Sequence, residues 1–201
     1  MRPGDQRFTG EICGFGSASG TRIVIGRWPQ SPFGSFADAM VEHGDGRRVL
    51  VAPSDEIATY VAAVYGFDHV AVGPVEVGRS AGELRFDSEP LAAAVSIGRR
   101  DALGWCLRIV PTAVARSPRW ATVVDPVARR VLRDVRTRGT TAGGTEFYGA
   151  GDRRRVIAVT ASWQGIDLGP LADVDPPVRF GFSSAPRTPS IVSVTTTVRP
   201  F

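Results

Sequence analysis

The stretch FADAMVEHGDGRRVLVA, residues 36–52, carries the clearest structural signal in the chain. Two strand-forming runs flank an Asp-Gly step, which is a favoured turn of a β-hairpin. Side chains alternate between the two faces of a strand, so Phe36, Asp38, Met40 and Glu42 share one face of the first arm. That face therefore carries two carboxylates beside two large apolar side chains.

Further strands are expected on both sides of this hairpin. Short runs rich in β-branched and aromatic residues, bounded by Gly- and Pro-containing turns, predict them. We expect strands at 8–15, 21–25, 67–77, 82–87, 90–97, 156–163, 178–182 and 190–198. Gly73-Pro74 interrupts the third run, which favours a sheet edge or a bulge. The run 91–97 is apolar on both faces, which favours a central position.

Three segments have the spacing of helices. The best predicted helix is 55–65, with Ser54 as its cap and acidic residues in its first turn. A second helix is expected at 101–110. A third is expected at 126–134, because proline fits the first position of a helix. The Gly- and Thr-rich segment 138–152 predicts either a mobile loop or a long hairpin tip.

This pattern predicts an α+β fold in which antiparallel β-structure predominates. About nine strands joined by short turns tend to curl, since large twisted sheets seldom stay open. We therefore expect a closed or half-open β-barrel with two or three helices packed on one side. Residues 1–201 show no internal repeat and no composition break, so a single domain is expected.

The composition excludes several classes of chemistry. All 24 basic residues are arginine, against 20 acidic residues, and the chain contains neither lysine nor asparagine. This usage is typical of a GC-rich genome, such as an actinobacterial one. Without lysine there is no side-chain Schiff base, no pyridoxal-phosphate enzyme and no Walker A loop. Without asparagine there is no N-glycosylation sequon.

No cofactor or metal is expected. The glycines of segment 14–20 precede a predicted strand, whereas a dinucleotide site needs a helix there. A zinc site would require Cys13, Cys106, His43 and His69 to converge, and the spacing of these residues gives no reason to expect that. The first residues show no signal peptide, and no apolar run is long enough to span a membrane, so a cytoplasmic protein is expected.

The carboxylates of the 36–42 strand are the candidate catalytic groups. Asp38 and Glu42 could act in proton transfer if their face turns toward an apolar cavity, because burial raises the pKa of a carboxyl group. The alternative is that they lie in water, paired with Arg47 or Arg48. The candidate substrate-binding residues are Arg27, Trp28, Met40, Glu76, Tyr148 and Trp163. Arg27 would neutralise an anionic group of the substrate, and Trp28 and Trp163 would shape the wall.

The segment RWPQSPFGSFADAMVE, residues 27–42, resembles the acetoacetate-decarboxylase-like superfamily. Those proteins place a Pro- and Gly-containing loop with an aromatic residue before an acidic strand, within a barrel of similar length. The resemblance covers about residues 20–80 and implies a shared fold. The decarboxylases of that family use a Schiff-base lysine, which this chain lacks. The resemblance therefore implies neither decarboxylase chemistry nor any catalytic residue.

Three functions remain open from the sequence. The first is a β-barrel that binds a small, largely apolar organic molecule and acts on it as a lyase, isomerase or cyclase. The second is a non-catalytic ligand carrier or protein-interaction module. The third is anion or nucleic-acid binding through the Arg-rich helix 126–134. A small-molecule ligand is the expected partner, nucleic acid and membrane are not, and the oligomeric state stays open, with a homodimer as one option.

Overall fold

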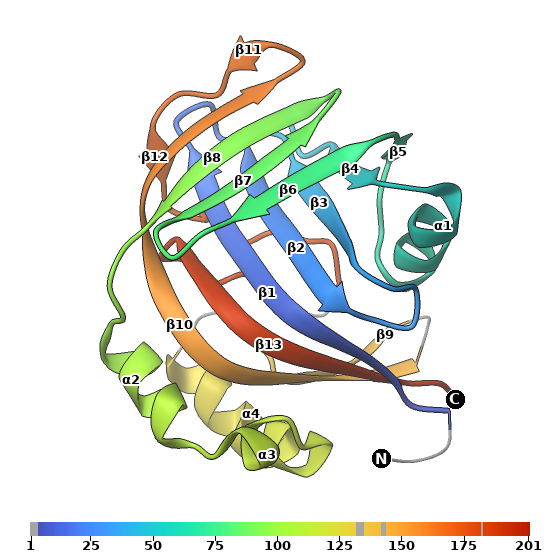
Figure 1. The fold of residues 1–201 in the computed structure, drawn as a ribbon, viewed down its shortest axis with the longest axis vertical. Helices are drawn as coiled ribbons and strands as arrows, with labels where there is room; N and C mark the ends of the chain where they lie inside the picture. The colour runs from blue at the N-terminus through green and yellow to red at the C-terminus, as the bar shows by residue number, and fades with distance from the viewer. Residues whose placement is uncertain (1–3, 132–134, 142–143, 182) are drawn as a thin grey trace.

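The computed structural model describes residues 4–131, 135–141, 144–181 and 183–201. These residues form thirteen strands and four helices (Figure 1). The strands are β1 (Gln6–Ser17), β2 (Arg22–Gln30), β3 (Phe36–Glu42), β4 (Arg48–Ala52), β5 (His69–Val72), β6 (Val75–Arg79), β7 (Glu83–Ser88), β8 (Leu91–Ile97), β9 (Arg138–Thr141), β10 (Gly144–Trp163), β11 (Ile166–Asp167), β12 (Leu171–Ala172) and β13 (Ser190–Arg199). The helices are α1 (Asp55–Val64), α2 (Ala102–Ile109), α3 (Thr112–Ala115) and α4 (Pro118–Val131).

The strands form one sheet that curls back on itself. Its order is β5-β4-β3-β2-β1-β13-β10-β8-β7-β6, and β4–β5 is the parallel pair among otherwise antiparallel pairs of the described strands. β5 and β6 follow each other in sequence but lie at opposite ends of this order. The Gly73-Pro74 step therefore links the two edges, and the sheet forms a half-open barrel (Figure 1). The predicted α+β class with mainly antiparallel strands is confirmed, as is the edge position of Pro74.

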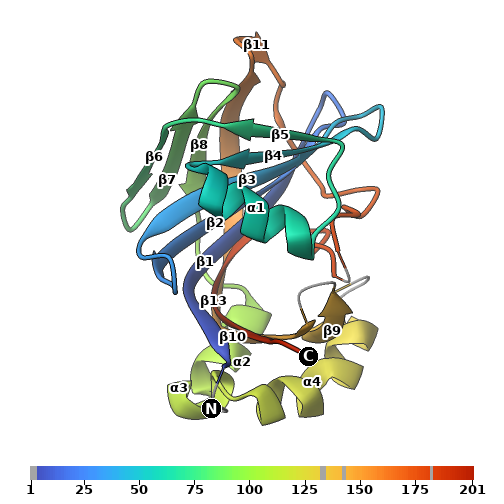
Figure 2. The ribbon, with the colours of Figure 1, turned by 90° about the vertical axis from the view of Figure 1, so that its right-hand side faces the viewer.

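The two faces of the sheet have different partners. Inside the curl, alternate residues such as Phe15, Ile23 and Ile25 pack against β7 and β8 in the main hydrophobic core. On the other face, Leu50 and Ala52 pack against the apolar side of α1. The face that carries Asp38 and Met40 is therefore turned toward the helices and not toward the interior of the curl. Figure 2 shows α1 over this part of the sheet and α2, α3 and α4 as a layer below it.

The described residues of segment 138–152 form paired strands, so they are neither the mobile loop nor the hairpin tip that the sequence predicted. β9 pairs with the first residues of β10, and β10 then curves along the molecule to pair with both β13 and β8. The glycines here permit close packing: a Cβ atom on Gly149 would lie 2.2 Å from the Ala115 carbonyl oxygen of α3. Gly104 of α2 meets the Arg153 carbonyl oxygen in the same way, at 2.1 Å. The absence of a side chain at Gly104 and Gly149 thus allows α2 and α3 to pack directly against the backbone of β10.

Most predicted helix and strand positions are confirmed. The strand predicted at 67–77 is instead two strands, β5 and β6, and three further corrections follow. The Ser54 hydroxyl caps α1, where it accepts a hydrogen bond from the backbone N–H of Ile57. The helix predicted at 126–134 begins eight residues earlier, at Pro118, and contains Pro126 in its interior; residues 132–134 lie outside the described part. Residues 112–115 form the unpredicted helix α3, and 178–181 are not a strand.

A proline at the first position of a helix and a proline inside a helix are hard to tell apart from sequence. Here only one run of apolar residues indicated where the helix begins. Among the described residues, no helix is long and apolar enough to cross a membrane.

Candidate functional site

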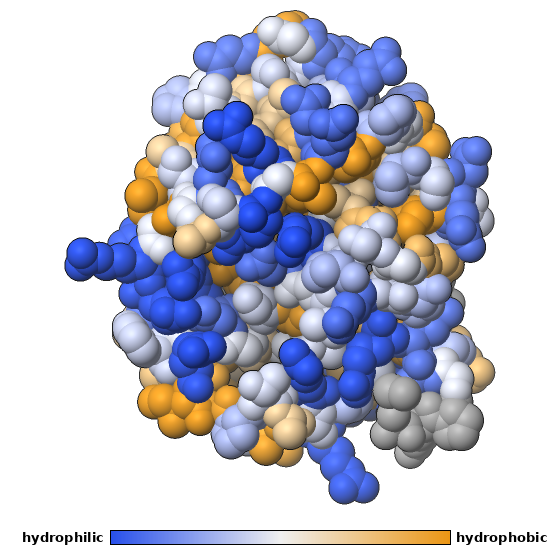
Figure 3. Space-filling view, in the orientation of Figure 1, coloured by the Kyte–Doolittle hydropathy of each residue, from blue (hydrophilic) through white to orange (hydrophobic). Residues whose placement is uncertain are grey.

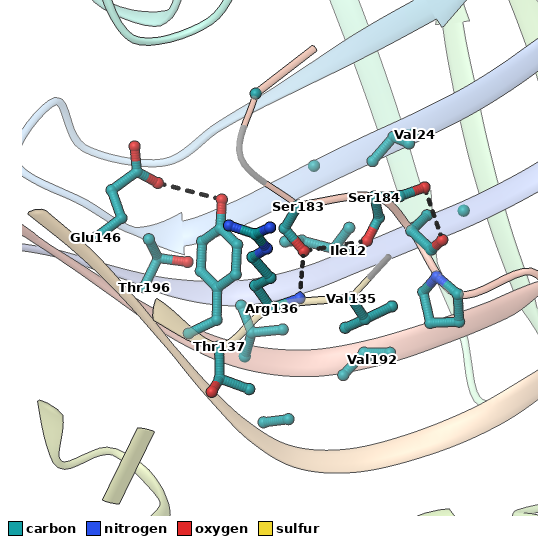
Figure 4. A pocket seen from close by; sticks show the side chains of 18 of the residues that line it. Ile12, Val24, Val135, Arg136, Thr137, Glu146, Ser183, Ser184, Val192 and Thr196 are labelled. Carbon is teal, nitrogen blue, oxygen red and sulfur yellow. Dashed lines mark hydrogen bonds between the residues drawn. The ribbon is translucent and has the colours of Figure 1, made fainter. Parts of the chain in front are cut away.

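A cavity of about 430 Å³ lies between the helix-facing side of the sheet and α1, α2 and α4 (Figure 4). Alternate residues of β1, β2, β3, β10 and β13 form its floor, and the described residues of segment 178–186 (178–181 and 183–186) close part of it. Most of the wall is aliphatic or aromatic. Typical wall residues are Ile12, Val24, Val61, Leu103, Leu107, Val124, Val192 and Val194. The wall also carries polar side chains, among them Asp38, Tyr65, Arg136, Glu146, Tyr148 and Ser183.

Asp38 is one of these polar groups. Its side chain lies on the cavity wall, is 3% exposed, and accepts a hydrogen bond of 2.9 Å from the indole Nε1 of Trp28. Gly26, which lies opposite Asp38 in the β2–β3 register, leaves the space that this pair occupies: a Cβ there would lie 2.4 Å from the Asp38 oxygen. Burial raises the pKa of Asp38 to about 7, and the Trp28 hydrogen bond opposes this only in part. Asp38 therefore titrates near neutral pH.

Glu146 is the second buried carboxyl group of the cavity. It is fully buried, and three hydroxyl groups contact it: Tyr65 at 2.8 Å, Thr141 at 2.9 Å and Tyr148 at 3.1 Å. Burial raises the pKa of Glu146, although all three hydrogen bonds act in the opposite direction. Figure 4 shows Glu146 beside Thr196, a buried residue on β13 whose hydroxyl has no hydrogen-bond partner within the described chain.

The hydroxyl groups around Glu146 also contact each other. The Tyr65 and Tyr148 oxygens are 2.7 Å apart, and both lie close to the same oxygen, Oε2, of Glu146. Three contacts around this triangle require three hydrogens, and the two phenols supply only two. The two phenols therefore cannot donate along all three contacts at once. This cluster is therefore a set of hydrogen-bond donors that can be rearranged toward a ligand oxygen.

Glu42 has a different environment from Asp38 although the two share a strand face. It is fully buried, does not line the cavity, and lies 2.9 Å from Arg22 Nη2 and 3.2 Å from Arg179 Nη2. It also accepts the backbone N–H of Arg179 at 2.8 Å. Among the described residues, neither Arg47 nor Arg48 forms an ion pair with Glu42, although Arg48 lies opposite it in the β3–β4 register. Glu42 thus fastens the segment 178–186, which closes the cavity, to β2 and β3.

The other candidate residues divide into two groups. Trp28, Met40 and Tyr148 line the cavity together with Asp38. Three others lie elsewhere: Arg27 faces Glu11 at 3.6 Å, Glu76 is exposed on β6, and Trp163 packs edge-on against His43.

Glu146 and Tyr65 also line the cavity, but neither of them was named from the sequence as a candidate site residue. The spacing of Glu146 and Tyr148 on one strand face was the available signal, and it was obscured by the expectation of a loop. No group of three or more His, Cys, Asp or Glu residues in the described part of the chain is arranged to hold a metal ion.

Comparison with known proteins gives a similarity of structure. No protein-family model and no curated protein matches the sequence. Among solved structures, acetoacetate decarboxylase from Legionella pneumophila is similar over 98% of this chain and 85% of that chain. The sequence identity is 10% and the TM-score is 0.46.

Proposed function

We propose that this protein binds a small, largely apolar organic molecule in the cavity and transfers a proton on it, with Asp38 as the acid–base group. The observation that carries this proposal is the state of Asp38. Its carboxyl group is buried in an apolar wall with a neutral donor, Trp28, and no recorded ion pair within the described residues. A carboxyl group with a pKa of about 7 can both accept and return a proton at neutral pH.

The cluster around Glu146 supports a second role in the same cavity. Tyr65 and Tyr148 can donate hydrogen bonds to a carbonyl or hydroxyl oxygen of the ligand. Opposite Tyr148 on β13, the buried hydroxyl of Thr196 has no hydrogen-bond partner among the described residues. Such donors stabilise negative charge that develops on oxygen when a neighbouring C–H bond loses its proton. A lyase, isomerase or cyclase reaction of a carbonyl compound fits this arrangement. Because the chain has no lysine, such a reaction proceeds here without a Schiff base to the protein.

Native mass spectrometry of freshly purified protein, compared with its denatured mass, is the first test. Mass that is retained in the native state and lost on denaturation would identify the ligand class and also report the oligomeric state. The released compound is then incubated with the wild type and with Asp38→Asn, and the products are separated by chromatography and weighed. Asparagine keeps an acceptor for Trp28 but cannot take up the proton.

We expect Asp38→Asn to bind the compound and to lose at least a hundredfold in turnover, the usual contribution of a positioned acid or base. The matched control is Asp45→Asn, which removes an exposed carboxylate in the β3–β4 turn. Binding without turnover by the wild type would favour a ligand carrier. Equal turnover by the wild type and Asp38→Asn would refute the assigned role of Asp38.

A further inference from the structure

The helices α2, α3 and α4 form a layer at one end of the molecule (Figures 1 and 2). This layer and its flanks, residues 99–138, contain ten arginines and three aspartates, a net charge of +7. The whole chain has a net charge of +4, so the remainder has a charge of −3. The positive charge of the sequence is therefore concentrated in residues 99–138, the segment that contains this helical layer.

The same layer exposes large apolar side chains. Ile109 is 81% exposed, Val123 67%, Val127 60% and Trp105 59%. Exposed arginines alternate with them along the helices: Arg108, Arg116, Arg119 and Arg130. No acidic partner is recorded for these four arginines among the residues that the structure describes. Figure 3 shows hydrophobic surface next to strongly hydrophilic surface at this end of the molecule.

We propose that this helical layer is a docking surface for an anionic lipid membrane. Helices that lie in a membrane interface combine exposed Trp or aliphatic side chains with Lys or Arg, because the first enter the headgroup region and the second pair with lipid phosphate. Positive charge alone would equally suit a nucleic acid. Exposed Ile109 and Trp105 have no role on a phosphate backbone, whereas they gain free energy by leaving water in a bilayer.

The position of the cavity adds to this proposal. Val127 and Cys106 line the cavity and are nevertheless exposed, so the cavity reaches the surface within the helical layer. An apolar ligand could then pass from the bilayer into the cavity without crossing water. This step rests on the proposed function, whereas docking itself does not. No membrane partner was expected from the sequence because no segment is long enough to span a membrane. A protein that binds only to the membrane surface does not need such a segment.

Sedimentation with lipid vesicles tests the docking surface. The full chain is mixed with vesicles of phosphatidylcholine alone, or of phosphatidylcholine with 30% phosphatidylglycerol, at about 0.05 M and 0.3 M salt. We expect binding to the anionic vesicles that weakens at higher salt, because salt screens the attraction. Arg108→Gln should weaken this binding about fivefold, as one charge near an anionic surface contributes. Ile109→Ser should weaken it roughly threefold to tenfold.

Two matched variants lie away from the helical layer. Ile166→Ser removes a side chain that is 71% exposed on β11, and Arg47→Gln removes a partly exposed arginine in the β3–β4 turn. Both should bind vesicles like the wild type, and circular dichroism should show that all four variants are folded. Equal affinity for both vesicle compositions, or retention on heparin without vesicle binding, would overturn the proposal. Ligand retention by Arg108→Gln in vesicle-free buffer separates this outcome from a failure of the proposed function.

Discussion

Asp38 should make the stability of the protein depend on pH in a defined direction. Its pKa is about 7 in the folded protein and near 3.8 in the unfolded chain, so the folded state binds the proton more tightly. Burial of Asp38 has no pH-dependent cost below about pH 4, an increasing cost up to pH 7, and a constant cost above it. Asp38→Asn removes this cost and keeps an acceptor for Trp28.

The free energy of unfolding of Asp38→Asn relative to wild type should therefore rise by about 2 to 3 kcal/mol between pH 5 and pH 8. Urea unfolding of both proteins at the two pH values measures this difference. A difference that does not change with pH would mean that Asp38 is ionised in the folded protein at pH 5.

Glu42 should matter for stability and not for chemistry. Glu42→Ala leaves Arg22, which is 5% exposed, without its buried partner, and also releases Arg179. Breaking a buried ion pair from one side destabilises a protein by about 3 to 5 kcal/mol.

The matched control is Glu83→Ala, which breaks the exposed pair with Arg85 and should cost less than about 1 kcal/mol. Denaturant unfolding compares the two variants. Similar losses in both would show that the Glu42 network does not hold the 178–186 segment.

Asp38 and Glu42 show what the alternation of side chains along a strand can predict and what it cannot. Period-two alternation places Asp38 and Glu42 on one face, and the structure agrees. Their different partners depend on Arg179, which is 137 residues away from Glu42 in sequence. The Glu146 cluster likewise joins Tyr65, at the end of α1, to three residues of the β9–β10 hairpin. No local pattern encodes such long-range contacts, so the sequence suggested Asp38 and Tyr148 but not the cluster.

Close helix–strand packing depends on single glycines of β10. Gly149→Ala places a methyl group 2.2 Å from the Ala115 carbonyl oxygen, so α3 must move away. We expect a loss of about 1 to 3 kcal/mol, as for other overpacked positions. Gly151→Ala is the matched control two residues along the same strand, because the nearest atom there is 4.0 Å away. Thermal unfolding of both variants measures the difference, and equal melting temperatures would contradict the packing role of Gly149.

These glycines also explain which elements the sequence misrepresents. Glycine in a strand suggests mobility when its neighbours in space are unknown, so β9 and the first half of β10 were expected as a loop or a hairpin tip. α1 was predictable because its cap, its acidic first turn and its apolar stripe are all local. α4 was placed too late because Pro126 has the features of a helix start, while the wall residue Trp120 lies before it. Local sequence patterns therefore predicted where helices and strands occur in this chain. Packing between distant residues determined where each of them begins and ends.

The whole molecule should contain two parts of unequal stability. Strand β1 is paired on both sides, by β2 and β13, and carries core residues Cys13 and Phe15 that are 0% exposed. In contrast, α2 buries only Gly104 and α3 only Ala115, and both lie on β10 through these small residues. Elements with few buried apolar side chains open locally at a lower free energy than core strands do. The helical layer that covers the cavity is thus the part best suited to admit a ligand.

Hydrogen–deuterium exchange followed by mass spectrometry measures this difference. Amides of α2 and α3 should exchange at least a hundredfold faster than those of β1 and β13, once corrected for intrinsic rates. The physical reason is that the helices can leave β10 while the main core inside the curled sheet stays intact. Equal protection of α2 and β1 would mean that the molecule opens as one unit.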